Sequence, residues 1–148
     1  MEFEIIDKEN ITTKSVYHAE EESIMTYGGK IDTSLCIQNT NLTLDIDIDT
    51  GFFMGVSGFT GSLKRVPSIK ISDITFKKGI LVYKKIEHLE KGMGYDIGYK
   101  GKILFDKTKK VIVILMETQP QIGEWFCVTS NVYVLVNSGE LCQIRIKI

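Results

Sequence analysis

Apolar and polar residues alternate without a break in Asn41-Leu42-Thr43-Leu44-Asp45-Ile46-Asp47-Ile48-Asp49. In an extended chain, successive side chains point to opposite faces, so the leucines and isoleucines share one face and the aspartates share the other. A period of two residues is typical of a strand with one buried face and one solvated face. We therefore predict a half-buried antiparallel strand over residues 41–49.

Other parts of the chain also indicate strands. The same alternation recurs in Cys142–Ile148, and a polar segment suited to a tight reversal separates it from Val132–Val136. We predict a hairpin there, and a second hairpin that joins Ile103–Phe105 to Val111–Met116. Apolar residues three or four positions apart indicate at most one short helix, around residues 83–92. Further strands are expected at Glu2–Ile6, Lys14–His18, Leu35–Gln38, Phe52–Phe59, Ser68–Ile71 and Ile80–Lys84.

The amino-acid composition favours sheet as well. Of the 148 residues, 43 are isoleucine, valine or threonine, and Ala19 is the one alanine. Branched side chains pack well on a pleated sheet, whereas alanine is the best helix former. We predict a mainly β protein, either a single antiparallel β-sandwich or an open barrel. At this length one globular domain over residues 1–148 is expected.

The sequence carries no signal for a membrane or for export. No apolar run approaches the roughly 18 residues of a membrane-spanning helix. The acidic start, Met1-Glu2-Phe3-Glu4, lacks the basic-then-apolar order of a secretory signal. Three widely spaced cysteines favour free thiols over a disulfide framework. We expect a cytoplasmic protein that does not bind a membrane.

Charge is divided unevenly along the chain. Residues 1–63 hold 11 acidic and 3 basic side chains, a net of −8, whereas residues 64–148 hold 15 basic and 8 acidic ones, a net of +7. One interpretation is internal, with acidic early strands lying beside basic later strands and offsetting them across the sheet. The other is functional, with an acidic surface that attracts a basic partner. The basic residues are dispersed, mostly lysine, and lack an aromatic-rich motif, so we do not expect nucleic acid binding.

The carboxylates of Asp45, Asp47 and Asp49 invite comparison with a calcium-binding loop. The comparison fails because that loop needs glycine at its sixth position and glutamate at its twelfth, where this chain has Thr50 and Val56. An extended strand also spaces alternate carboxylates roughly 6.5–7 Å apart, which is too far for one ion to bind all three. We predict no metal site. The candidate residues for binding a partner are Asp45, Asp47, Asp49, Glu20, Glu21 and Glu22.

Signals for catalysis are weak. His18 and His88 each have a glutamate two positions later, Glu20 and Glu90, which could orient the imidazole as a general base if the backbone is extended. The glycines of residues 92–101 match neither a phosphate-binding loop nor a dinucleotide-binding fingerprint. We name no catalytic residue and no cofactor. Whether the protein is an enzyme stays open, with the balance towards a non-enzymatic protein.

Three functions follow as hypotheses. The first is a non-enzymatic protein-binding domain with an acidic face, in the manner of an immunity or inhibitor protein that neutralises a basic partner. The second is a small-ligand-binding barrel with an aromatic-lined pocket, with or without catalytic activity. The third is a structural subunit that pairs strands with its own copy, which would make a homo-oligomer. The pocket candidates for the second hypothesis are Phe52, Phe53, Phe59, His88, Tyr95, Tyr99 and Trp125.

Overall fold

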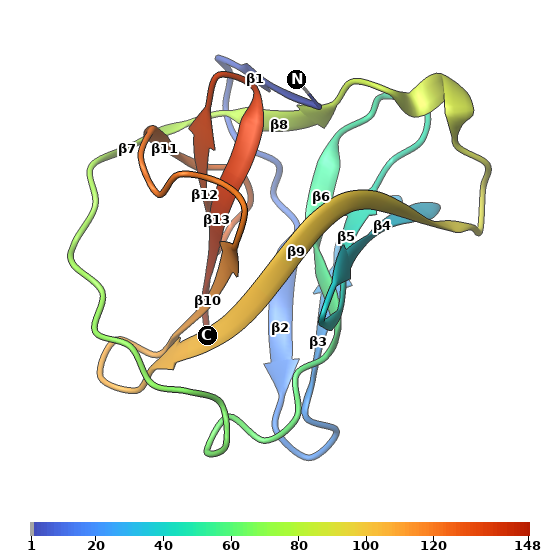
Figure 1. Ribbon diagram of the computed structural model, residues 1–148. Coiled ribbons are helices and arrows are strands. Elements are labelled where there is room, and N and C mark those ends of the chain that lie inside the picture. The colour runs from blue at the N-terminus through green and yellow to red at the C-terminus, as the bar shows by residue number, and fades with distance from the viewer. Residues whose placement is uncertain (1) are drawn as a thin grey trace.

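The computed structural model describes residues 2–148, which fold mainly into strands (Figure 1). Two strands, β1 (Phe3–Ile6) and β8 (Ile80–Tyr83), pair with each other in a small antiparallel sheet. The mainly β prediction is confirmed. The other strands are β2 (Lys14–His18), β3 (Ser23–Tyr27), β4 (Thr33–Gln38), β5 (Asn41–Ile46), β6 (Phe53–Phe59), β7 (Phe76–Lys78), β9 (Gly94–Asp106), β10 (Val111–Met116), β11 (Glu124–Cys127), β12 (Val132–Asn137) and β13 (Glu140–Lys147).

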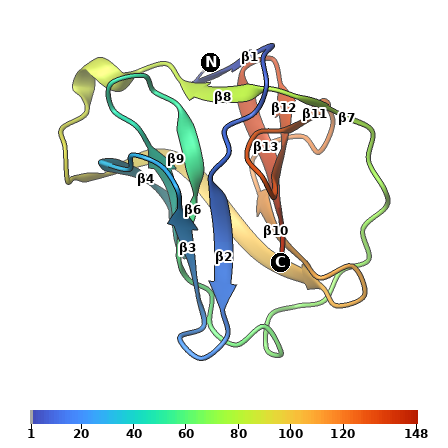
Figure 2. The same cartoon turned by 180° about the vertical axis from the view of Figure 1, so that it is seen from behind.

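These eleven strands form one large sheet in the order β2-β3-β6-β5-β4-β9-β10-β13-β12-β11-β7. The sheet curls so that its two halves face each other, as an open half-barrel (Figures 1 and 2). Most neighbouring strands are antiparallel, as predicted, but β4 with β9 and β7 with β11 are parallel. Parallel neighbours need a long crossover connection, and in both cases other strands intervene in the chain.

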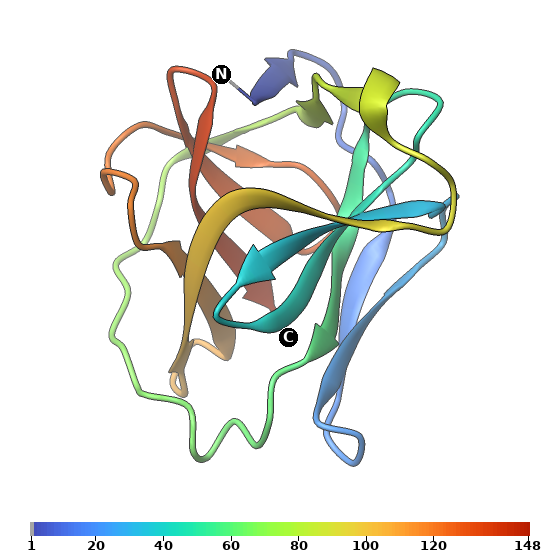
Figure 3. The same cartoon turned by 45° about the vertical axis from the view of Figure 1, so that its right-hand side comes forward.

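The long strand β9 joins the two halves of the sheet. Its first part pairs with β4 and its second part pairs with β10. Cys36 lies opposite Asp96 while Gln38 lies opposite Lys100, so β9 carries extra residues at this point. Gly98 lies inside this bulge at φ +84°, a conformation that glycine adopts without steric cost. We attribute the bend of β9 from one half of the sheet to the other, visible in Figure 3, to this bulge.

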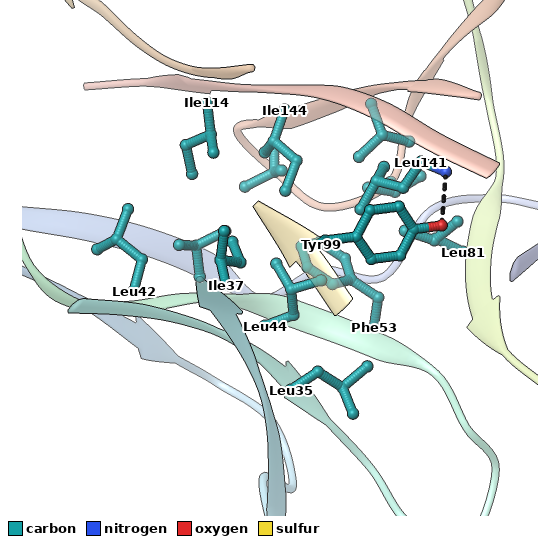
Figure 4. Close-up of a cluster of buried hydrophobic side chains, with 14 of the residues drawn as sticks. Leu35, Ile37, Leu42, Leu44, Phe53, Leu81, Tyr99, Ile114, Leu141 and Ile144 are labelled. Carbon is teal, nitrogen blue, oxygen red and sulfur yellow. Dashed lines mark hydrogen bonds between the residues drawn. The ribbon is translucent and has the colours of Figure 1, made fainter. Parts of the chain in front are cut away.

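The space enclosed by the curled sheet is filled by side chains. Leu42, Leu44 and Ile46 of β5 are at most 1% exposed, as their alternation predicts. Burying an aliphatic side chain of this size contributes roughly 1.5–3 kcal/mol to stability, which makes such a cluster the main support of the fold. Figure 4 shows how side chains from both halves of the large sheet meet in it together with Leu81 of β8, among them Leu35, Ile37, Phe53, Tyr99, Ile114, Leu141 and Ile144.

The segment between β6 and β7, residues 60–75, crosses the outer face of the half of the sheet that β9 to β13 form, and we call it the strap. Ile69 and Ile71 of the strap pack on a second, smaller core. The carboxylate of Asp106 fastens the strap, because its Oδ2 accepts a hydrogen bond from the backbone N–H of Ile71 at 3.0 Å. The residues of this smaller core are Leu104, Val111 and Val113.

Some expectations were wrong in detail. Ser68–Ile71 is not a strand, because its backbone meets β9 at a single bridge, between Ser68 and Phe105. The prediction of at most one short helix around residues 83–92 is confirmed: this segment holds one 3₁₀ turn, η1 (Ile86–His88), and the backbone at Leu89 is already extended. Strands β3, β7 and β11 were not predicted. Within residues 2–148, no helix is long and apolar enough to cross a membrane.

Candidate functional site

The two differently charged parts of the sequence form the two halves of the large sheet. Strands β2 to β6 come from the acidic part, and β7 and β9 to β13 come from the basic part. In the described sheet the two sets meet at the β4–β9 pair. For residues 2–148, the ion pairs that join the two parts are Glu2–Lys85 at 3.0 Å and Glu9–Lys78 at 3.3 Å. Both glutamates precede β2. The negative charge of strands β2 to β6 is therefore not neutralised by ion pairs with basic residues on neighbouring strands.

Asp45 is buried, although the alternation of residues 41–49 placed it on a solvated face. It is 3% exposed, because Thr26 and Ser15 of the β2–β3 hairpin pack over Gly55 next to it. The Asp45 carboxylate accepts hydrogen bonds from the hydroxyls of Thr26, at 2.7 Å, and Ser57. Burial raises the pKa of Asp45, and these hydrogen bonds lower it in part. Asp45 is thus part of the interior packing and does not face a partner.

Asp47 and Asp49 lie in the turn that follows β5, together with Asp32 from the segment before β4. The three carboxylates surround the ammonium of Lys30, whose Nζ lies 3.5 Å from Asp32 and 3.6 Å from Asp47 and also contacts Asp49. Their oxygen atoms lie within 4.8 Å of one another, a spacing that one cation could bridge. The sequence argument against a metal assumed that residues 41–49 are one extended strand, in which alternate carboxylates lie far apart. That assumption does not hold for Asp47 and Asp49, because β5 ends at Ile46 and the turn after it brings these two carboxylates close together. The lysine ammonium already lies among them, and the expected absence of a metal stays a prediction.

Glu20, Glu21 and Glu22 form the turn between β2 and β3. The backbone carbonyl of Glu22 accepts hydrogen bonds from the N–H and the hydroxyl of Thr60, at 2.9 and 3.0 Å, which fixes the turn against the end of β6. Glu20 and Glu21 are exposed, and no ion pair to the three glutamates is formed by any residue from 2 to 148. Since β3 and β5 both run antiparallel to β6, this turn lies at the opposite end of the sheet from Asp47. The six acidic candidates therefore occupy three separate places.

Large apolar side chains are exposed beside the glutamate turn. Met25, Tyr27 and Phe59 are 49%, 46% and 51% exposed. Ser23 lies opposite Phe59, and Met25 and Tyr27 follow Ser23 at intervals of two residues, so all three side chains share the outer face. We call Met25, Tyr27 and Phe59 the hairpin face. An exposed apolar group next to unpaired charges is typical of a protein-interaction surface.

The seven pocket candidates do not line one cavity. Phe53 and Tyr99 are core residues, at most 4% exposed. The Tyr99 hydroxyl donates a hydrogen bond to Glu140 at 2.5 Å, and burial raises the pKa of this tyrosine. Phe59 belongs to the hairpin face, and the interior in which a ligand would lie is filled (Figure 4). The other four are dispersed: Phe52 before β6, His88 in η1, Tyr95 near the start of β9 and Trp125 on β11.

The two histidines contact residues other than the glutamates suggested by the sequence. The Nε2 atom of His18 lies 2.8 Å from the hydroxyl of Tyr27, and the two rings meet edge to face with centroids 5.8 Å apart. The Nε2 atom of His88 lies 3.7 Å from a carboxylate oxygen of its neighbour Glu87. His18 therefore supports the hairpin face by holding the ring of Tyr27.

Sequence reasoning missed three residues that shape these surfaces. Met25 and Tyr27 lie in Ile24-Met25-Thr26-Tyr27, whose β-branched and aromatic residues could have indicated β3. Lys30 is the one basic residue between Lys14 and Lys64, so its pairing with nearby Asp32 was foreseeable. Its contacts with the later aspartates depend on the fold and had no local signal. No protein-family model matches this chain, and no curated protein sequence matches it significantly.

Proposed function

We propose that this chain is a non-enzymatic protein-binding domain that binds a basic protein through the hairpin face and the adjacent glutamates. The observation that supports the proposal best is the exposure of three large apolar side chains on one face beside Glu20 and Glu21. An immunity-type inhibitor of a basic enzyme would be one form of this function.

The chemistry of the hairpin face suits a protein partner. Methionine and aromatic side chains are enriched at the centres of protein interfaces, where they lose contact with water on binding. Tyr27 also keeps a polar group at its tip, already oriented by His18. The side chains are therefore partly ordered before a partner arrives, which lowers the entropy lost on binding.

The negative charge around the hairpin face favours a basic partner. Glu20 and Glu21 attract basic side chains, and the other acidic strands on this half of the sheet add a long-range field of the same sign. Such charges at the rim of an interface mainly accelerate association and exclude acidic competitors. A basic partner is thus favoured over a neutral one.

The other two hypotheses receive less support. A small-ligand barrel needs an internal cavity, whereas side chains fill the interior. Self-association through a sheet edge is disfavoured at β7, since it carries Lys77 and Lys78, and charged residues on an edge strand oppose pairing with another copy.

Affinity capture with a matched pair of variants tests the proposal. The double variant Met25→Ser/Phe59→Ser removes the apolar part of the hairpin face, and Met93→Ser/Ile122→Ser removes two exposed apolar residues elsewhere, which are 52% and 68% exposed. We expect the wild type and the control to retain the same basic protein at low salt, and the hairpin variant to lose it. High salt should weaken retention because it screens the glutamates.

Three results would contradict the proposal. They are retention of the partner by the hairpin variant, an acidic or neutral partner, and retention that is equal at low and high salt.

A further inference from the structure

The opposite half of the sheet carries a groove with the other sign of charge. It has a volume of about 460 Å³ and lies between the strap and the outer face of β10, β12 and β13. The cationic side chains that line it are Lys109, Arg145 and Lys147, and Asp73 is its one acidic residue. This volume is in the range of sites that hold compact organic ligands, roughly 300–1,000 Å³.

Arg145 lies in the middle of this outer face rather than at its rim. Its strand neighbours across the sheet are Val113 on β10 and Tyr133 on β12. The guanidinium stacks over the ring of Trp125, with the Cζ atom 4.4 Å from the ring centroid. Its Nη1 atom donates a hydrogen bond to the backbone carbonyl of Ser72 in the strap, at 3.0 Å. The planar group is therefore held in one orientation at the groove wall, and its Nη2 makes no hydrogen bond within the described residues.

Arg145 forms no ion pair with any described residue, although the Asp106 carboxylate attracts its charge from a longer distance. Its Nε atom donates to the neutral amide of Gln143 at 2.8 Å, and across residues 2–148 no carboxylate comes within 4 Å of the guanidinium. Burial lowers the pKa of Arg145, which indicates that the charge has lost part of its hydration. Lys147 likewise has no ion pair within the described residues, whereas Lys109 is paired with Asp73 at 2.8 Å. An anion in the groove would meet two cations that form no ion pair within residues 2–148.

The remaining walls of the groove are apolar. The rings of Phe76 and Tyr133 meet edge to face with centroids 5.0 Å apart and form one wall. Ile71, Ile74 and Val111 complete the lining. A ligand that gained from the whole groove would therefore combine an anionic group with an apolar body.

We propose that this groove binds a compact organic anion, whose carboxylate or phosphate group meets Arg145 and Lys147 while its aromatic or aliphatic body lies against Phe76 and Tyr133. The site is separate from the hairpin face and lies on the other half of the sheet, so it does not depend on the function proposed above.

The single tryptophan of the chain gives a direct readout, because Trp125 lies under the guanidinium that would contact the anion. The full chain is titrated with benzoate and with phenyl phosphate, and its tryptophan fluorescence and its melting temperature are followed. The two probes distinguish a carboxylate from a phosphate ligand. Benzyl alcohol, which lacks the charge, and inorganic phosphate, which lacks the ring, serve as ligand controls. A ligand that binds the folded protein alone raises its melting temperature.

We expect at least one of the two aromatic anions to bind saturably and more tightly than both controls. Arg145→Gln should weaken binding about tenfold or more, since hydrogen bonds to a charged group are the strong ones. Lys147→Gln changes an exposed side chain and leaves the backbone bonds of Lys147 in place, and it should weaken binding about threefold through lost attraction. Lys77→Gln removes a charge on the neighbouring strand β7 outside the groove and should leave binding unchanged.

The proposal is overturned if neither anion binds, if benzyl alcohol or inorganic phosphate binds as tightly as the better anion, or if Lys77→Gln weakens binding as much as Lys147→Gln does.

Discussion

The side chain of Asn131 and the backbone of Ser15 exchange two hydrogen bonds although they are 116 positions apart. The N–H of Ser15 donates to Oδ1 at 2.9 Å, and Nδ2 of Asn131 donates to the carbonyl of Ser15 at 2.6 Å. Two facing residues of antiparallel strands form the same pair of hydrogen bonds between their backbones. Here the side-chain amide of Asn131 takes the place of the backbone of one of the two residues. Nδ2 also donates to the carbonyl of Lys147 at 2.8 Å, so Asn131 links the edge strand β2 to β13, which face each other in Figure 2.

Asn131→Ala should lower the free energy of unfolding by about 2–4 kcal/mol, because it leaves buried backbone groups without partners. Asn10→Ala is the control, since among residues 2–148 the side-chain amide of Asn10 donates only to the carbonyl of the next residue, Ile11. Chemical denaturation measures both. A loss in Asn131→Ala no larger than in the control would show that this asparagine does not hold the edges of the sheet together.

Asp45→Asn should make the protein more stable at pH 7. Burial raises the folded-state pKa of Asp45 above its ordinary value of 3.8, so folding favours the protonated carboxyl. The stability from this group is present below that value and is lost as the pH rises through the folded-state pKa. Asparagine cannot ionise, yet its Oδ1 can still accept a hydrogen bond from Thr26 or Ser57. Chemical denaturation from pH 3 to pH 7 should therefore show that the free energy of unfolding of Asp45→Asn increasingly exceeds that of the wild type as the pH rises. The exposed Asp7→Asn is the control and should show no such difference. A difference between Asp45→Asn and the wild type that does not change with pH would contradict this role of Asp45.

Gly55→Ala should destabilise the protein by about 1–3 kcal/mol, as overpacking of a filled site does. A Cβ at this position would lie 2.3 Å from the Thr26 hydroxyl and 2.7 Å from the Ser15 hydroxyl, so the β2–β3 hairpin would have to move. Gly94→Ala is the comparison, because its Cβ would approach one atom, the Cys36 sulfur, at 3.3 Å. Equal thermal stability of the two variants would mean that the hairpin is not closely packed over β6.

Lys30→Gln should reduce stability by about 0.5–1 kcal/mol at low salt, because it leaves Asp32, Asp47 and Asp49 without their shared cation. High salt screens the repulsion between the carboxylates, so the difference from wild type should shrink there. Urea denaturation at two salt concentrations measures it, with the exposed Lys64→Gln as control. A loss that does not depend on salt would contradict the electrostatic explanation.

The sequence was sufficient for the fold class and for most strands in both halves of the sheet. Val132–Asn137 and Glu140–Lys147 form the expected hairpin because turn residues and alternation agree there. The order of strands could not be predicted, because it depends on the bulge at Gly98 and on the Asn131 side chain, which act between distant segments. All three residues of β7 are exposed and show no apolar periodicity. The sequence therefore contained no signal for this strand or for its pairing with β11.

The candidate surfaces were predicted less well than the fold. Alternation gave the correct inward face of β5 but placed Asp45 in water, because it cannot show that a second hairpin covers the outer face. The unequal charge of the two parts of the chain was visible, and the sheet order shows that the acidic strands stay together. Arg145 was passed over because its position in the middle of a groove depends on the strap, which crosses it from a distant part of the chain.

Backbone amide NMR shifts, recorded while the protein is titrated with a short peptide of alternating lysine and leucine, would locate the binding surface for a basic partner. The shifts should concentrate in residues 20–27 and at Phe59, saturate with peptide, weaken with salt, and disappear in the Met25→Ser/Phe59→Ser variant. Shifts centred on the turn of Asp47 and Asp49, or spread over the surface without saturation, would contradict the assignment of the hairpin face as the site that binds a basic protein.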